Sequence, residues 1–125
     1  MATGAEPGPD SSLASEEYCY LTTVGRKTGK PHRIEIWFAL RDPTVFMLSG
    51  GRNKSDWVKN LVANPAVKLE LSVETIAATA RSEVTPEEDA WARQALVAKY
   101  QPGYDGDLTN WGKTSLVVAH DIAPA

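Results

Sequence analysis

Apolar and polar residues alternate along several short segments of this 125-residue sequence, and this two-residue period restricts the fold more than any other feature. The clearest case is residues 33–40, where every second residue is large and apolar: Ile34, Ile36, Phe38 and Leu40. Because successive side chains of a strand point to opposite sides of a sheet, the pattern predicts a strand with one buried face. Residues 67–73 show the same alternation, which is typical of a half-buried antiparallel strand.

Four further segments are predicted to be strands because they are rich in aromatic, β-branched or other apolar residues: 18–24, 44–49, 75–84 and 115–122. Gly, Pro, Asn or Asp residues separate most of these segments from their neighbours, as expected of turns. Five or six strands joined in this way predict a mainly antiparallel sheet built from hairpins.

Two helices are predicted between the strands. The first covers residues 55–63, with Ser55 as its N-cap. The second covers residues 85–100, whose opening Thr-Pro-Glu-Glu combines a capping box, a first-turn proline and acidic residues. Residues 101–110 are predicted to be a loop. Antiparallel strands with two packed helices predict an α+β domain in the form of a small antiparallel barrel.

Length and composition allow one domain. Apolar residues make up 42% and charged residues 23% of the chain, which is typical of a folded protein. Residues 1–14 are rich in Gly, Pro, Ser and Ala and are predicted to be a flexible lead-in to a single domain over residues 15–125. No apolar run is long enough for a transmembrane segment, and the first residues lack a signal-peptide pattern.

The chain contains one cysteine, Cys19, and two histidines. A single cysteine excludes an internal disulfide and a multi-cysteine metal site. We therefore predict a cytoplasmic protein without a metal centre.

Positive charge is concentrated in one part of an acidic chain. The net charge is −3, but residues 26–59 hold eight of the 13 Lys and Arg residues and only three of the 16 Asp and Glu residues. A basic segment within an acidic protein favours a small anionic ligand. It argues against nucleic acid, because nucleic-acid binders are usually basic overall.

Two glycine-containing turns carry much of this positive charge. The first is Gly-Arg-Lys-Thr-Gly-Lys at residues 25–30, and the second, residues 49–55, joins a predicted strand to a predicted helix. Glycine lets backbone amides approach an anion, while Arg, Lys or a helix N-terminus neutralises its charge. Each turn alone could equally be an ordinary solvated turn. Their occurrence together favours one anionic ligand bound by both.

Aromatic residues form a second candidate feature. Trp37 lies on the polar face of the predicted strand 33–40, where it could wall a planar ligand or pack in a core or subunit interface. Tyr100, Tyr104 and Trp111 are spaced through the predicted late loop. They could line a substrate entrance or pack the loop onto the domain.

The residues of the two turns resemble a known family. TTVGRKTGKP at residues 22–31, SGG at residues 49–51 and WVKNLVANPAV at residues 57–67 are similar to segments of deazaflavin-dependent nitroreductases. The similarity extends over residues 18–120. Members of that family are split β-barrels related to pyridoxamine phosphate oxidase-like flavoproteins, and many use coenzyme F420. The resemblance implies a small antiparallel split β-barrel with two or three packed helices.

The activity implied by this resemblance is hydride transfer from the reduced deazaflavin to a small electron-poor acceptor such as a quinone, an enone or a nitro compound. The phosphate and glutamates of the cofactor tail would meet the first turn at Lys27, with Lys30, His32 and Arg33 as further candidates. The family's deazaflavin position matches Ile34, Glu35, Ile36, Trp37, Ser49, Gly50, Gly51, Asp56, Trp57, Val58, Lys59 and Asn60. Tyr100 and Tyr104 match the tyrosines of the acceptor site. The proton donor for the reduced acceptor is Tyr104 or water.

Two other functions agree with the same residues. An FMN-dependent reductase or oxidase on the same barrel would use the basic turn for the FMN phosphate. A non-catalytic module could bind a cofactor or single-stranded nucleic acid, but few aromatic residues lie near the basic turns to stack bases. A small-molecule acceptor is therefore the expected partner, without nucleic acid, and the sequence is compatible with a homodimer.

Overall fold

A computed structural model describes residues 11–123 of the chain. Of the lead-in predicted over residues 1–14, residues 1–10 lie outside this range. The described remainder belongs to a short 3-10 helix, Ser11–Ser15, in which Leu13 is buried at 6% exposure. Leu13 packs with the core of the domain, so the chain joins the fold before residue 15.

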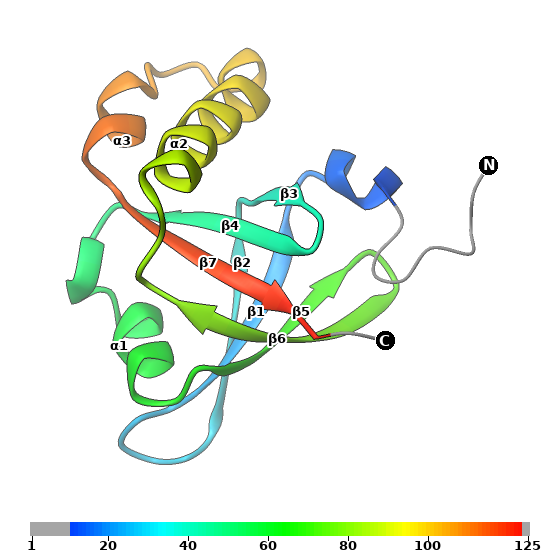
Figure 1. The fold of residues 1–125 in the computed structure, drawn as a ribbon, viewed down its shortest axis with the longest axis vertical. Coiled ribbons are helices and arrows are strands. Elements are labelled where there is room, and N and C mark those ends of the chain that lie inside the picture. Colours follow the sequence, from blue (N-terminus) through cyan, green and yellow to red (C-terminus); the bar gives the residue numbers. More distant parts are fainter. Residues whose placement is uncertain (1–10, 124–125) are drawn as a thin grey trace.

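Seven antiparallel strands form one curled sheet in the described part of the chain, one more than the largest number predicted (Figure 1). The strands are β1 Cys19–Val24, β2 Pro31–Ile36, β3 Ala39–Arg41, β4 Thr44–Ser49, β5 Ala66–Leu71, β6 Glu74–Arg81 and β7 Leu116–Ile122. Their order across the sheet is β2-β1-β5-β6-β7-β4-β3. The predicted antiparallel α+β architecture is confirmed.

The extra strand arises because the single strand predicted over residues 33–40 is divided. β2 pairs with β1 at one edge of the sheet, whereas β3 pairs with β4 at the other edge. Trp37 and Phe38 connect them, so consecutive residues join the two edges of the curled sheet. The alternation still holds across the break, because Ile34, Ile36, Phe38 and Leu40 all pack in the same core cluster.

The sheet separates two apolar cores. The first core cluster lies on the side covered by α1 (Asp56–Ala63) and is formed by Leu13, Cys19, Leu21, Phe38, Val45, Met47, Val58, Leu61, Val67, Leu69, Leu71, Ile76, Ala78, Ala80 and Val118. The second lies under α2 (Pro86–Tyr100) and is formed by Ala39, Phe46, Leu48, Ala92, Leu96, Tyr100, Leu108, Val117 and Ala119. β4 is buried along its whole length because it contributes to both clusters.

The two predicted helices are confirmed, and a third, α3 (Thr109–Thr114), begins in the last two residues of the loop predicted over residues 101–110. The total of three in the described residues agrees with the two or three helices that the family resemblance implies. Thr85 and Glu88 form the expected capping box of α2. α3 packs beside α2 (Figure 1), and a Cβ atom at Gly112 would lie 2.5 Å from Val97 Cγ2. This close approach depends on a contact between distant residues, which the local sequence pattern does not reveal. None of the helices in the described residues has the length and apolar character needed to cross a membrane.

Candidate active site

The first basic turn joins β1 to β2 and has a closed backbone. Gly25 N donates a hydrogen bond to Lys30 O (2.7 Å), and Gly29 N donates one to Gly25 O (2.8 Å). Gly29 has a φ of 74°, a conformation that favours glycine. The turn therefore has a defined shape and holds its basic residues in fixed backbone positions.

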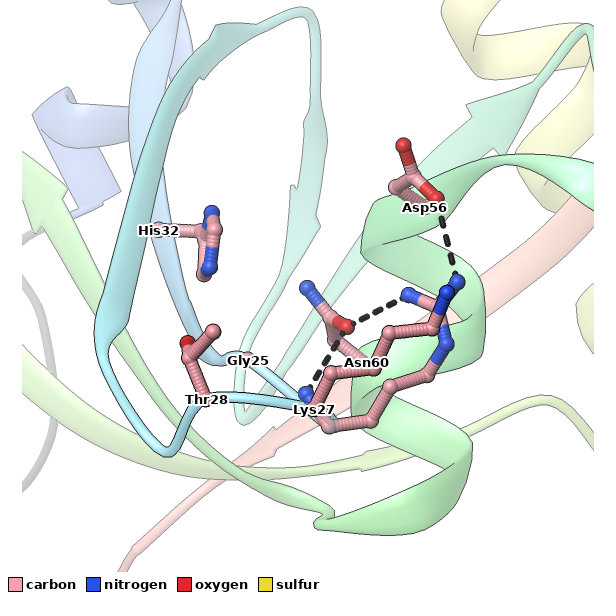
Figure 2. A pocket seen from close by; sticks show the side chains of 7 residues that line it. Gly25, Lys27, Thr28, His32, Asp56 and Asn60 are labelled. Atoms are coloured by element: carbon pink, nitrogen blue, oxygen red, sulfur yellow. Dashed lines mark hydrogen bonds and ion pairs between the residues drawn. The ribbon is translucent and has the colours of Figure 1, made fainter.

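Arg26 attaches this turn to α1. Its backbone N and its Nη1 both donate to Asn60 Oδ1 (3.2 and 2.8 Å), and its Nη2 lies 3.2 Å from Asp56 Oδ1. Asn60 is buried, with 4% exposure, and its Nδ2 also donates to Thr23 Oγ1 (3.3 Å). Asn60, predicted as a cofactor contact, thus holds together β1, the basic turn and α1. Figure 2 shows Asn60 facing the basic turn from α1.

A basic pocket of about 280 Å³ lies between the turn and α1. Its lining residues are Gly25, Arg26, Lys27, Thr28, His32, Asp56 and Asn60. The His32 ring lies over Gly25, where an added Cβ atom would be 2.5 Å from His32 Nε2. The Arg26 guanidinium is engaged by Asp56 and Asn60, whereas Lys27 has no ion-pair or hydrogen-bond partner for its ammonium among the described residues. Lys27 therefore offers its positive charge to a ligand.

Arg33 does not line the basic pocket. Its Nε and Nη2 bind the Glu70 carboxylate at 2.8 and 3.2 Å, and its guanidinium carbon lies 3.7 Å from the centre of the Tyr20 ring. The hydrogen bond from Arg33 lowers the pKa of Glu70. Arg33 therefore has partners within the protein, on the outer surface of β1, β2 and β5.

The other predicted cofactor residues fall into two groups outside the basic pocket. Those that pack toward the first core cluster are Ile34, Ile36, Trp57 and Val58. Those that are exposed are Lys30, Glu35 and Lys59. Glu35 accepts a hydrogen bond from the Tyr20 hydroxyl at 3.4 Å. A role of these residues in cofactor binding stays a prediction.

The second turn, predicted over residues 49–55, forms a junction between β4 and α1 and is held by side-chain contacts. Ser49 Oγ donates to Arg52 O (2.8 Å) and lies 2.8 Å from Ser55 Oγ. Arg52 Nε donates to Thr114 O (2.7 Å), which ties the junction to α3. The junction therefore connects α1, which lines the basic pocket, with α3.

An aromatic pocket of about 400 Å³ lies at the other end of β2. Its lining residues are Trp37, Tyr104, Gly106, Asp107, Leu108 and Trp111. The Trp37 ring stands perpendicular to Tyr104 (centroids 5.8 Å apart, 88°) and to Trp111 (5.7 Å, 90°). Three of the four predicted aromatic residues therefore line this pocket. Asp107 accepts hydrogen bonds from Thr109, which lower the pKa of its carboxyl.

Tyr100, predicted as an acceptor contact, lies behind this pocket. Its ring stacks on Trp37 (4.3 Å, 4°) and is only 7% exposed. Its hydroxyl accepts from Phe38 N (3.0 Å) and lies 2.8 Å from Glu17 O, and burial raises its pKa to about 12. Lys99 Nζ donates to Phe38 O at 3.0 Å, and burial lowers its pKa to about 8. Tyr100 and Lys99 therefore hold the connection that carries Trp37.

The basic and aromatic pockets lie at the two ends of one strand. His32 belongs to the basic pocket and Trp37 to the aromatic pocket, and the five residue steps between them span roughly 17 Å in an extended strand. The junction runs between the same two regions, since a Cβ atom at Gly50 would lie 3.7 Å from the Trp111 ring. An elongated ligand with an anionic end and a planar end fits this arrangement.

Sequence reasoning missed the linking role of Arg26 and the place of Thr28 in the basic pocket. Both stand inside the GRKTG motif, so the motif itself was the available signal. The pairing of Arg26 with Asp56 and Asn60 had no sequence signal, because these residues are 30 and 34 positions apart. No cluster of three or more His, Cys, Asp or Glu side chains suited to a metal ion occurs among the described residues.

Several solved structures share this fold. A conserved hypothetical protein from Mycobacterium tuberculosis is 18% identical, with a TM-score of 0.70 over 99% of this chain and 86% of its own. A structure described as an F420-H2 dependent reductase is 22% identical, with a TM-score of 0.64 over 86% and 94% of the two chains. A protein from Listeria innocua, provisionally assigned as a pyridoxamine 5'-phosphate oxidase, is 16% identical, with a TM-score of 0.61 over 90% and 86%. These likenesses confirm the split-barrel fold.

A family model described as F420H(2)-dependent quinone reductase matches residues 4–120, which is nearly the whole chain. The match confirms the expected reductase class and coenzyme F420 as the cofactor. The chain belongs to the F420H(2)-dependent quinone reductase family.

Proposed function

We propose that this reductase uses its two pockets for two different parts of one reaction: the basic pocket binds the tail of F420H2, and the aromatic pocket binds a quinone. The observation that carries this proposal is the position of the pockets at opposite ends of β2, beside one β4–α1 junction. A cofactor whose tail lies at Lys27 can then extend along β2 toward Trp37.

Lys27 and His32 are the side chains that would bind the tail. A lysine ammonium without a protein partner gives a charge-assisted hydrogen bond to a phosphate or carboxylate. Arg26, held by Asp56 and Asn60, keeps the turn in place and adds to the positive potential of the pocket. The backbone of residues 49–51 is the proposed contact for the planar part of the cofactor, because the junction connects both pockets.

The bound cofactor supplies the hydride, and the chain supplies position and surroundings. Trp37 and Trp111 give apolar walls against which a flat acceptor can stack and from which water is displaced. A quinone that gains a hydride also needs a proton to become a hydroquinone. Tyr104 lines the aromatic pocket, and its hydroxyl is the proposed donor of a hydrogen bond to the developing oxyanion. Water is the source of the proton if the hydroxyl does not supply it.

Enones and nitro compounds are proposed as further acceptors, since they share the planar, electron-poor character of a quinone. Measuring kcat/KM with one acceptor of each class would establish the order of preference among them. A homodimer stays a prediction that a molar mass from light scattering would decide.

The protein should bind oxidised F420 at least tenfold more tightly than FMN. A tenfold difference is about 1.4 kcal/mol, which one charged contact to the longer tail can supply. Titration of the protein with each cofactor, followed by quenching of its four tryptophans, measures both dissociation constants. Equal or tighter binding of FMN would favour the flavin-dependent alternative.

Tyr104→Phe should lower kcat with a quinone by about tenfold, the scale expected for one lost transition-state hydrogen bond. The dissociation constant of F420 should change less than about twofold, because Tyr104 lines the aromatic pocket and not the basic pocket. Tyr18→Phe, at an exposed tyrosine outside both pockets, is the matched control. Unchanged turnover in Tyr104→Phe would show that the Tyr104 hydroxyl takes no part in the reaction.

A further inference from the structure

Gln101, the residue that follows α2, binds the backbone of the loop that carries Tyr104. Its Nε2 donates to Gly106 O (2.7 Å) and to Tyr104 O (3.3 Å), and its Oε1 accepts from Leu108 N (2.8 Å). Its backbone oxygen also accepts from Tyr104 N (3.1 Å). One residue thus makes four hydrogen bonds to residues 104–108, which supply four of the six lining residues of the aromatic pocket.

Other support for the loop comes from Leu108, which is buried in the second core cluster, and from Thr109, which donates two hydrogen bonds to Asp107. Residues 102–107 are exposed, and Tyr104 is 47% exposed. The Tyr104 ring lies over Gly106, where a Cβ atom would be 2.7 Å from Tyr104 Cε2. The position of the ring therefore follows the path of the loop backbone, which the Gln101 side chain binds at residues 104, 106 and 108.

The facing wall of the pocket is held differently. Trp37 stacks on the buried Tyr100, and the backbone of Phe38 is bound by Tyr100 and Lys99. This wall is part of the second core cluster. The spacing between the Trp37 and Tyr104 rings therefore depends on the path of the exposed residues 102–107, because the facing wall is packed into the core.

We propose that Gln101 is a positioning residue for the acceptor: by binding residues 104–108 it holds the Tyr104 ring opposite Trp37 at the separation that admits a planar acceptor. The inference rests on the proposed function of the aromatic pocket. Gln101 itself does not line the pocket and acts through Tyr104. Holding reacting groups in place before the substrate binds increases the reaction rate, and small displacements of these groups lower it strongly.

Two substitutions test the side-chain hydrogen bonds. Gln101→Leu removes all of them, and Gln101→Glu keeps the shape and the acceptor for Leu108 N but replaces the donor with an ionised oxygen facing two carbonyls. With menadione as the quinone, each variant should lower kcat/KM about tenfold while the dissociation constant of F420 stays within about twofold. Gln94→Leu, at an exposed glutamine of α2 without a hydrogen bond to the described residues, should match the wild type.

A double-mutant cycle with Tyr104→Ala separates positioning from general damage to the fold. If Gln101 acts through Tyr104, Gln101→Leu has no further effect on kcat/KM once the ring is absent. The amides of residues 103–108 should also exchange with solvent faster in Gln101→Leu, with or without cofactor.

Additive effects in the cycle, unchanged amide exchange, or a kcat/KM of Gln101→Leu within twofold of the wild type would each overturn the inference. These results differ from a failure of the proposed function. In that case the wild type itself would not reduce menadione with F420H2.

Discussion

Between pH 7 and pH 4.5 the free energy of unfolding should fall by about 2.5 kcal/mol because of one residue, His120. His120 lies on β7, where it pairs with Val45 of β4 and Ala80 of β6, and it is 0% exposed. Neither ring nitrogen has a hydrogen-bond partner among the described residues. Burial lowers the pKa of His120 from 6.5 to about 3, so its ring is neutral in the folded protein.

The direction of the effect follows from where the proton binds. Below pH 6.5 the unfolded chain takes up a proton at His120, whereas the folded protein does so only near pH 3. Protonation therefore favours the unfolded state, and the free energy of unfolding decreases as the pH falls through this window. The hydrogen bond from Arg81 lowers the pKa of Glu88 from 4.5 to about 2. Carboxyls of this kind add to the loss of stability at lower pH, where they become protonated in the unfolded chain.

Urea denaturation at several pH values measures this effect. His120→Leu should lose the decrease between pH 7 and pH 4.5, because leucine cannot take up a proton in the unfolded state. It should also be more stable at pH 7, since an unsatisfied buried polar group costs about 1–3 kcal/mol. If the wild-type protein is equally stable at pH 7 and pH 4.5, His120 is not held neutral in the folded state and the prediction is wrong.

The faces of the strands could be predicted from the sequence because burial on one side of a sheet requires a two-residue period. Ile34, Ile36, Phe38 and Leu40 all reach the first core cluster, as the alternation indicates. The period does not reveal that β2 and β3 pair with different strands. That division depends on which partner strand lies beside each half, and the partners β1 and β4 are separated in sequence.

The positions of the turns and aromatic residues along the chain could also be predicted, but the directions in which their side chains point could not. The GRKTG motif located the basic turn, yet Arg33, seven residues after Arg26, binds Glu70 on the outer surface. Tyr100 and Tyr104 are close in sequence, but one lies behind Trp37 and the other lines the pocket. The end of α2 separates them, and a change from helix to loop changes the direction of successive side chains.

Lys27→Ala should weaken the binding of F420 by about 1.5–3 kcal/mol, which is a factor of about ten to more than a hundred in the dissociation constant. Lys27 lines the basic pocket, and its ammonium has no ion-pair or hydrogen-bond partner among the described residues. The neighbouring Arg26 has its guanidinium engaged by Asp56 and Asn60. An anionic tail would therefore take its charge-assisted contact from Lys27 without breaking a contact inside the protein.

Lys30→Ala is the matched control because Lys30 belongs to the same turn and is exposed but does not line the pocket. It should change the dissociation constant less than about twofold, since an isolated exposed charge contributes little. Lys27→Arg, which keeps the charge, should recover most of the affinity. The melting temperature should stay nearly constant in all three variants, because none loses a contact within the protein.

Fluorescence titrations at low and high salt complete the test. The difference in affinity between the wild type and Lys27→Ala should become smaller as salt screens the contact, but it should remain measurable because the pocket is partly enclosed. If Lys27→Ala and Lys30→Ala weaken binding equally, the turn attracts the cofactor through its total positive potential. A larger loss for Lys27→Ala alone identifies a direct contact, and it assigns the basic pocket to the anionic end of the cofactor.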